Sequence, residues 1–248
     1  MLNVKNISKS YRTGNKTYEV LKSISFHVEK GEFIAVMGPS GSGKTTLLNC
    51  ISCYIPFESG EITLEGTELS RLDAEELARV RNQKLGFVFQ DFMLLDGLKV
   101  RDNIMLPRII EGRVSQDMER ETEKLGKLFG ITQILDKYPA EISGGEKQRT
   151  AVARALINHP LLMLADEPTG NLDSKSSRTV IDSFARARHD LDATIFMVTH
   201  DSYAASFCDR VIILKDGEIF AIVKHEGNRK QFQEELLKII QEMSGELS

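Results

Sequence analysis

The sequence predicts an α/β fold in which a core of strands and helices is interrupted by a helical segment and then resumes. The first observation is a set of short apolar runs with the length of strands buried on both faces, at residues 33–37, 86–89, 161–165, 194–198 and 211–214. The second is a Gly-rich loop that follows the first run and opens a helical pattern at 44–52. The third is the stretch 97–158, which carries helical periodicity and almost no strand signal.

Turn and capping residues predict the other elements of the first two thirds of the chain. Further β-like runs lie at 2–6, 20–28 and 61–64. Asp73 and Glu76 form a capping-box pattern that opens a helix reaching about residue 83. Pro107 is expected to kink or end one helix and Gly130 to close another. The charged run 113–127 is expected to be a solvated helix face, and contact with a partner is the alternative.

The last third of the chain returns to alternating strands and helices. Helices are expected at 174–189 and 202–207, and Asp216-Gly217 between two apolar runs predicts a type I′ hairpin. Residues 231–243 form an amphipathic pattern whose polar face is not basic, so we expect this tail helix to dock on the protein's own core rather than on a membrane. Its apolar face would consist of Phe232, Leu236, Leu237, Ile240 and Met243.

Composition excludes several classes of protein. The chain has 248 residues, of which 41% are hydrophobic and 27% charged, and its net charge is −4, so intrinsic disorder is not expected. This balance also argues against a nucleic-acid partner bound through charge. No apolar run approaches the roughly 18 residues of a membrane span, and no leader pattern begins the sequence. Three cysteines, an odd number, do not make a disulfide framework, so we expect a reduced, cytosolic protein.

Residues 38–45 match the pattern G-x-x-x-x-G-K-[ST] between a buried strand and a helix, which is the context that this phosphate-binding motif requires. Glycines let successive N–H groups point at a β-phosphate, and the helix N-terminus adds its positive end. Lys44 would offset the charge of the β- and γ-phosphates, Thr45 would ligate Mg²⁺ and Thr46 would reach the α-phosphate. The plain alternative is a Gly-rich strand-to-helix turn. The predicted nucleotide-binding residues of this loop are Gly38, Pro39, Ser40, Gly41, Ser42, Gly43, Lys44, Thr45 and Thr46.

A second motif supports the first. The apolar run 161–165 ends in Asp166 and Glu167, and in P-loop proteins such a strand lies beside the phosphate-loop strand. Asp166 would hold Mg²⁺, directly or through water, and Glu167 would polarise the attacking water. An acidic strand end without function is the alternative. The guanine-reading pattern Asn-Lys-x-Asp of P-loop GTPases does not occur. The two motifs together predict a P-loop protein that binds a nucleoside triphosphate with Mg²⁺.

The segment Ile142-Ser143-Gly144-Gly145-Glu146-Lys147-Gln148-Arg149 resembles the signature motif of ABC-type ATPases. It places N–H groups and a hydroxyl at the start of a helical run, which is an anion site. Ser143 with Glu146 also fits a capping box, the purely structural interpretation. Six motifs follow one another in the order that is typical of the family. They are the phosphate loop, Gln90, this signature, the Asp-Glu strand, the segment 171–173 and His200. The chain is therefore identified as a member of this family, with the resemblance covering residues 11–217.

The resemblance implies a role for each motif. Ser143 and Gly145, with Gly144 and Glu146 beside them, would meet the γ-phosphate of a nucleotide held by another subunit. Because one chain has one phosphate loop and one signature, two complete sites require a head-to-tail homodimer with ATP in between. Tyr11 would stack on adenine, Asp173 would lie at the dimer seam, and His200 would contact the γ-phosphate. The implied catalytic residues are Lys44, Gln90, Glu167 and His200, and the implied metal ligands are Thr45, Gln90 and Asp166.

The resemblance also implies an α/β fold with a P-loop NTPase (RecA-like) core that uses ATP and Mg²⁺, an N-terminal antiparallel β subdomain and an inserted α-helical subdomain. We expect the ATP-binding core with its β subdomain at residues 1–90 and 159–224. The helical signature subdomain would span 91–158, and a C-terminal helical tail would span 225–248.

Segments outside these motifs indicate a branch of the family. Residues 89–95 and 100–104 resemble the macrolide-export, lipoprotein-release and cell-division branch. Residues 137–142, 171–175, 204–208 and 229–233 look more like the ATPase subunits of bacitracin and lantibiotic resistance transporters. That implies an ATPase at the cytoplasmic face of the membrane, held there by a separate permease and linked through it to a sensor histidine kinase.

Other functions remain open beside this one. The alternatives are the other members of that branch and a nucleic-acid-associated ABC ATPase. A P-loop scaffold that binds nucleotide without turnover is disfavoured by the presence of Lys44, Glu167 and His200. The ATPase does not touch the cargo, so its residues identify neither the cargo nor the direction of transport.

Three local features depart from the family pattern or invite another interpretation. Glu146 stands where many members have Gln, and a carboxylate there lowers the positive potential offered to a phosphate. Gly170-Asn171 precedes Leu172-Asp173 where Ser-Ala is frequent. Cys50 and Cys53 form a C-x-x-C on the helix after the phosphate loop, and we expect both thiols to face the core rather than to bind a metal.

Overall fold

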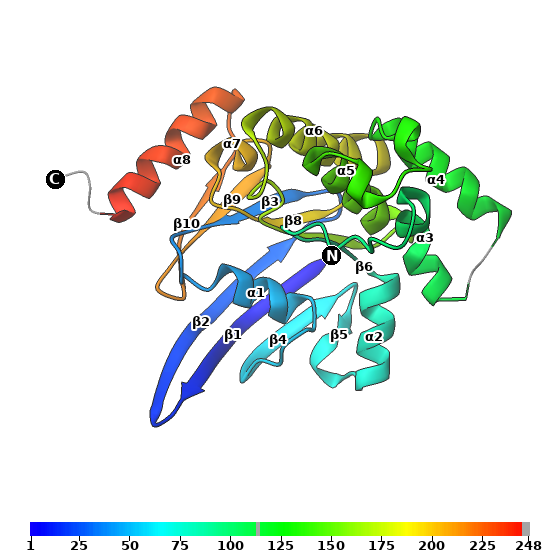
Figure 1. Cartoon of the computed structure of the whole chain (residues 1–248). Coiled ribbons are helices and arrows are strands. Elements are labelled where there is room, and N and C mark those ends of the chain that lie inside the picture. The colour runs from blue at the N-terminus through cyan, green and yellow to red at the C-terminus, as the bar shows by residue number, and fades with distance from the viewer. Residues whose placement is uncertain (113–114, 245–248) are drawn as a thin grey trace. The chain divides into compact units, whose positions relative to one another are not determined.

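The computed structural model describes residues 1–112 and 115–244 (Figure 1). The chain divides into two compact units. The first unit consists of Met1–Leu77 and Phe196–Ser248, and the second of Ala78–Ile195. Helix α2 (Ala74–Gln83) and strand β8 (Ile195–Val198) cross the two boundaries. The division expected from the sequence, with a separate helical subdomain at 91–158, stays a prediction.

An antiparallel sheet forms the N-terminal part of the first unit. Its strand order is β2-β1-β4-β5, and the strands span Leu2–Thr13 (β1), Lys16–Val28 (β2), Ser59–Leu64 (β4) and Thr67–Glu68 (β5). Strands β1 and β2 extend well beyond the expected runs 2–6 and 20–28. The outer part of this hairpin is polar and exposed, so backbone pairing rather than apolar alternation holds it, with Tyr11 opposite Tyr18.

A second sheet of the first unit carries the phosphate loop. Strands β3 (Phe33–Met37) and β9 (Arg210–Lys215) pair in parallel, and β10 (Glu218–Lys224) pairs antiparallel with β9. All five residues of β3 are buried, as expected for a strand covered on both faces. Asp216 and Gly217 both have positive φ, 50° and 83°, which confirms the predicted type I′ turn between β9 and β10.

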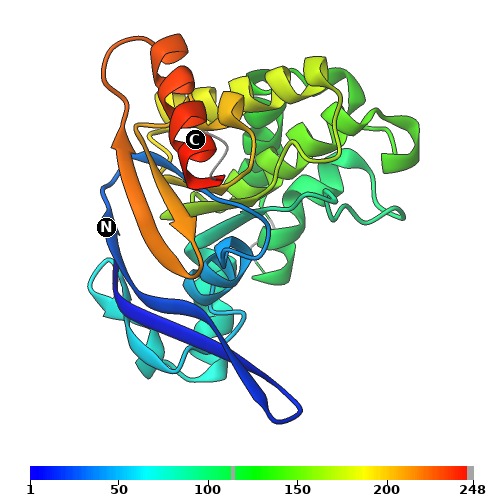
Figure 2. The ribbon, with the colours of Figure 1, turned by 90° about the vertical axis from the view of Figure 1, so that its left-hand side faces the viewer.

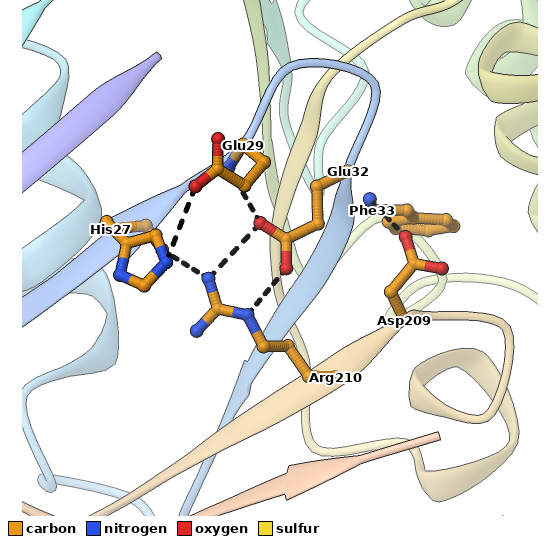
Figure 3. A network of polar contacts seen from close by, with 6 residues as sticks. All are labelled: His27, Glu29, Glu32, Phe33, Asp209 and Arg210. Atoms are coloured by element: carbon orange, nitrogen blue, oxygen red, sulfur yellow. Dashed lines mark hydrogen bonds and ion pairs between the residues drawn. The ribbon is translucent and has the colours of Figure 1, made fainter. Parts of the chain in front are cut away.

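A buried ion pair joins the starts of β3 and β9 (Figure 3). The Arg210 guanidinium donates from Nε to Glu32 Oε1 at 2.6 Å and from a terminal nitrogen to Glu32 Oε2 at 3.2 Å. The same guanidinium donates to the His27 carbonyl. Burial acts to raise the pKa of Glu32, but the hydrogen bonds from Arg210 and the Glu29 N–H, with the charge of Arg210, outweigh it and lower that pKa. The pair therefore fixes the strand that leads into the phosphate loop.

The short helices α1 and α2 follow the predicted pattern with one exception. Helix α1 (Lys44–Ile51) follows the loop, and α2 begins with the predicted capping box, because Asp73 and Glu76 exchange hydrogen bonds of 2.9 and 2.8 Å. Cys50 is buried in α1, and its burial raises the pKa of the thiol to about 12. The prediction that Cys53 shares this helix is wrong, because α1 ends at Ile51 and Cys53 lies in a turn with φ 60°.

The C-terminal helix α8 (Arg229–Ser244) packs within the first unit against α7 (Ser202–Ala205) (Figure 2). Phe232 and Leu236 are fully buried, Met243 is buried, and the His225 ring stacks on Phe232 with the centroids 4.7 Å apart. Arg229 lies over the Phe207 ring at 4.2 Å. The expected apolar face is wrong in one member, since Leu237 is 43% exposed, and residues 245–248 of the expected tail lie outside the described residues.

The second unit contains a parallel strand pair and a group of helices. Strands β6 (Leu85–Val88) and β7 (Leu162–Asp166) pair in parallel, and helix α5 contacts β6, α3 and α6. The helices span Val100–Ile110 (α3), Gln116–Leu128 (α4), Gly144–Leu156 (α5) and Ser174–Leu191 (α6). Short 3₁₀ turns lie at Leu69–Arg71 (η1) in the first unit and at Thr132–Ile134 (η2) and Pro139–Glu141 (η3) in the second.

The ends of these helices agree only in part with the prediction from the sequence. Helix α3 continues through Pro107 to Ile110, so the proline does not end it. Gly130, at φ 65°, closes α4 as predicted: its N–H bonds the Lys127 carbonyl and the next N–H bonds the Gly126 carbonyl, a Schellman ending. In the charged run only Arg113 and Val114 lie outside the described residues. From residue 117 on the acids and bases are exposed except Glu121, whose side chain is only 16% exposed, while Met118 and Leu125 are buried.

Candidate nucleotide-binding site

The phosphate loop of the first unit has the conformation that only glycines allow. Gly38, Gly41 and Gly43 have φ of 153°, 81° and 100°. A Cβ at Gly43 would lie 2.7 Å from the Val20 carbonyl oxygen, and one at Gly38 would lie 2.2 Å from the Leu214 carbonyl oxygen. Gly43 is the N-cap of α1, so the orphan N–H groups of the first helical turn line the loop. The loop is thus shaped as an anion cradle.

Lys44 lies across this cradle. Its Nζ donates to the Gly38 carbonyl at 2.9 Å and to the Pro39 carbonyl at 3.0 Å. The ammonium is therefore held at the loop by its own backbone, where it can exchange a carbonyl for a phosphate oxygen without a large movement of the chain. Ser42 is buried, Thr46 is half-buried and Thr45 is exposed, so the Thr45 hydroxyl is open to a ligand.

Two more predicted residues belong to the first unit. Tyr11 is 43% exposed on the outer part of β1, and the Lys9 ammonium lies 5.3 Å from the centroid of its ring. His200 is exposed and follows β8, and the turn behind it is tied by hydrogen bonds from the Asp201 N–H to Thr199 and from the Tyr203 N–H to Asp201. Both residues are exposed, and their predicted roles stay predictions.

In the second unit the acid pair stands at the end of a buried strand. Asp166 and Glu167 are half-buried, and Glu167 adopts a left-handed conformation with φ 45°. A buried glutamine braces this turn: Gln148 Nε2 donates to the Pro168 carbonyl at 2.8 Å and to the Phe89 carbonyl at 3.1 Å. One side chain of α5 therefore ties the segment after Glu167 to the segment before Gln90.

The signature segment forms the predicted capping box at the start of α5. The Ser143 hydroxyl and N–H both donate to Glu146 Oε2, at 2.7 and 2.8 Å, and the Glu146 N–H lies 3.4 Å from Ser143 Oγ. These bonds, the backbone one above all, lower the pKa of Glu146. The two glycines also have a packing role, because a Cβ at Gly145 would lie 3.2 Å from Ser176 Cβ and one at Gly144 would lie 3.0 Å from Leu172.

The loop that precedes α6 holds two predicted residues through separate hydrogen bonds. Asp173 is the N-cap of α6, where it accepts hydrogen bonds from the Ser176 hydroxyl and the Lys175 and Ser176 N–H groups, and the hydroxyl bond is the first cause of its lowered pKa. Gln90 Nε2 donates to Asn171 Oδ1 at 3.1 Å. Sequence reasoning missed the roles of Asn171 and Gln148, since each bonds a segment more than fifty residues away.

A glycine cradle with a lysine across it, a half-buried acid pair at the end of a buried strand and a helix-capping signature define a P-loop ATPase. The family can now be stated, because a family model described as ABC transporter matches residues 21–170, and the chain belongs to that family.

Known proteins similar to the chain lie in this family. The chain is 48% identical to the ABC transporter ATP-binding protein YxdL of Bacillus subtilis over 99% of its own length and 95% of that protein. It is 47% identical to the bacitracin export ATP-binding protein BceA of Halalkalibacterium halodurans over 96% of this chain and 94% of that protein. A dimeric post-hydrolysis structure of the cassette MJ0796 of Methanocaldococcus jannaschii, bound to ADP and Pi, superposes with a TM-score of 0.82 at 36% identity over 92% of this chain and all of that one.

The predicted fold class, a P-loop ATPase core of the ABC type, is therefore confirmed. So is the predicted function in its general form: the chain is the ATP-binding subunit of an ABC transporter and an ATPase. Within residues 1–112 and 115–244, no helix combines the length and apolar character needed to cross a bilayer.

Proposed function

We propose that this chain is the Mg²⁺-dependent ATPase of a peptide-antibiotic resistance transporter of the bacitracin and lantibiotic type. The observation that carries the proposal is the near full-length similarity to the bacitracin export protein, which extends well beyond the segments that hold the catalytic motifs. The cargo does not contact this subunit. The similarity therefore indicates the type of permease with which the chain works, rather than a cargo-binding site in the chain.

The donor set fits a hard divalent cation. Thr45 offers a hydroxyl, Asp166 a carboxylate and Gln90 an amide oxygen, and Mg²⁺ prefers such oxygen ligands with water completing its shell. Bound there, Mg²⁺ would neutralise charge on the β- and γ-phosphates. Lys44 would bind the same phosphates, and Glu167 would accept a hydrogen bond from the attacking water and orient it. His200 would donate to the γ-phosphate, and Tyr11 would hold the adenine by stacking.

We infer that two copies act head to tail. Each chain has one cradle and one signature, so the γ-phosphate held by Lys44 of one copy would meet Ser143 and Gly145 of the other. Hydrolysis removes that shared phosphate and lets the copies separate. The dimeric MJ0796 structures support the pairing of two copies. The pair would lie at the cytoplasmic face of the membrane, held by the permease, with a sensor histidine kinase as a further partner.

The test is to coexpress the chain with the polytopic permease encoded beside it, purify the complex into lipid nanodiscs and measure ATP hydrolysis. Bacitracin or a lantibiotic should stimulate hydrolysis, a macrolide should not, and the Glu167→Gln complex should show no stimulated hydrolysis. Stimulation by the macrolide alone would instead favour the macrolide-export alternative. A neighbouring frame without a permease, or a complex insensitive to peptide antibiotics, would contradict the proposal.

A further inference from the structure

Three side chains of the second unit form a continuous hydrogen-bonded chain. Asn171 Nδ2 donates to Asp91 Oδ1 at 2.7 Å, and Gln90 Nε2 donates to Asn171 Oδ1 at 3.1 Å. The same Asn171 amide nitrogen lies 3.4 Å from the Gln90 carbonyl oxygen. Two loops that are about eighty residues apart in the sequence are joined in this way.

The chemistry of these three side chains gives the network a direction. An ionised carboxylate can only accept hydrogen bonds, so Asp91 must face the NH₂ group of Asn171. That orientation leaves Asn171 Oδ1 toward Gln90, and an oxygen at that position can only be satisfied by the NH₂ group of Gln90. The amide of Gln90 is thereby turned so that Oε1 is the end that Asn171 does not engage. Without the carboxylate, only the longer contact of 3.4 Å with the Gln90 carbonyl oxygen would hold Asn171 Nδ2 in this orientation.

The loops that carry these residues are held independently. Gln148 bonds the carbonyl of Phe89, and Arg154 donates to the carbonyl of Phe92 at 2.7 Å and to that of Met93. Phe92 and Met93 both adopt left-handed conformations, with φ of 61° and 48°. Gly170 leaves room for the glutamine, because a Cβ there would lie 2.8 Å from Gln90 Nε2. Side chains of α5 thus hold the backbone of both loops, at Phe89–Met93 and at Pro168, so the three polar side chains are left to set orientation.

We propose that Asp91 and Asn171 are positioning residues, which turn the amide oxygen of Gln90 outward so that it is presented to a divalent cation. This inference rests on the proposed function, in which Gln90 is a Mg²⁺ ligand. It follows the general pattern in which a second group fixes the orientation of a metal-binding side chain. It also assigns a purpose to Asn171, which stands where another residue is frequent in the family.

The test measures the Mg²⁺ requirement of nucleotide binding rather than turnover. Binding of a fluorescent, non-hydrolysable ATP analogue is titrated with MgCl₂ and repeated in EDTA, and the melting temperature of each nucleotide-free variant is recorded. Asn171→Leu keeps the size of the side chain and removes both hydrogen bonds. The double variant Asp91→Asn with Asn171→Asp exchanges carboxylate and amide at unchanged net charge, so position 171 still presents an acceptor to the Gln90 NH₂ group.

We expect Asn171→Leu to raise the Mg²⁺ concentration for half-maximal nucleotide binding by about tenfold. This is the lower limit of the loss in metal affinity that follows removal of a group that orients a metal ligand. Binding in EDTA should be unchanged, and the exchanged pair should restore the wild-type Mg²⁺ requirement. Asp96→Asn, an exposed carboxylate of the same segment, is the matched control and should behave as wild type.

Two results would overturn the inference. One is an unchanged Mg²⁺ requirement in Asn171→Leu, and the other is an exchanged pair no better than Asn171→Leu. An effect on EDTA binding and melting temperature with no change in Mg²⁺ requirement would reduce the network to a structural link between loops. Gln90→Ala separates this failure from that of the proposed function: if it also leaves the Mg²⁺ requirement unchanged, Gln90 is not a ligand at all.

Discussion

The Ser143 hydroxyl donates a 2.7 Å hydrogen bond to the carboxylate of Glu146, so the signature serine is engaged by its own helix. The Ser143 N–H donates to the same oxygen. In the proposed dimer this hydroxyl must turn to the γ-phosphate of the nucleotide held by the other copy. The carboxylate thus competes with the phosphate for one donor, and it also places a negative charge at the helix N-terminus where the phosphate would arrive.

Glu146→Gln should therefore tighten ATP-driven pairing slightly. A neutral amide accepts a weaker hydrogen bond than a carboxylate and removes the like charge. The expected helix-terminus effect is about 0.3–1 kcal/mol, or about twofold to fivefold, for each of the two sites of the dimer. Sedimentation with ATP in the Glu167→Gln background measures the dimer constant. An unchanged or weaker dimer would show that the carboxylate does not compete with the phosphate.

Lys44→Ala should abolish nucleotide binding at concentrations that saturate the wild type, because the charge that offsets the triphosphate is removed from the cradle. Its two hydrogen bonds to loop carbonyls are partly exposed, so the melting temperature should change little. Lys16→Ala, in the exposed end of the β1–β2 hairpin, is the control and should bind normally. Nucleotide binding in Lys44→Ala at wild-type affinity would contradict the assignment of the phosphate loop.

Arg210→Met should destabilise the protein by about 3–5 kcal/mol at neutral pH, because it leaves the Glu32 carboxylate buried without its partner. The side chains of the pair are only 9% and 15% exposed. The folded pKa of Glu32 lies below its ordinary value of 4.5, so the pair's contribution is complete above pH 4.5 and is lost as the pH falls through the lower, folded value. Denaturant unfolding across that range should show wild type and variant converging in acid. A constant difference at every pH would contradict this account.

Phe232→Ala should cost about 3–5 kcal/mol of unfolding free energy, since a buried ring and its stacking on His225 are lost. The matched control is Leu237→Ala on the same helix, where the side chain is 43% exposed and the change should be small. A truncated chain that ends at Lys224 should still bind ATP if α8 is a docked element only. If the truncated chain loses both its fold and its nucleotide binding, α8 is part of the core.

The sequence predicted those features that depend on neighbours in the chain. The glycine cradle, the capping boxes at Asp73 and Ser143 and the helix ending at Gly130 are each set within a few residues, and the structure contains all of them. The links through Gln148, Asn171 and Arg154 were not predicted, because each joins segments far apart in the sequence and no local pattern reports the partner. Leu237 was misassigned because 3.6-residue periodicity leaves the margin of an apolar face ambiguous.

The central claim is that ATP joins two copies through the cradle of one and the signature of the other. Sedimentation velocity of Glu167→Gln tests it most directly, since this variant should retain ATP but hydrolyse it slowly. We predict a dimer with ATP, a monomer without it, and a monomer with ATP when Lys44→Ala is added. If Glu167→Gln with bound ATP stays monomeric, both alone and in complex with its permease, the claim is contradicted.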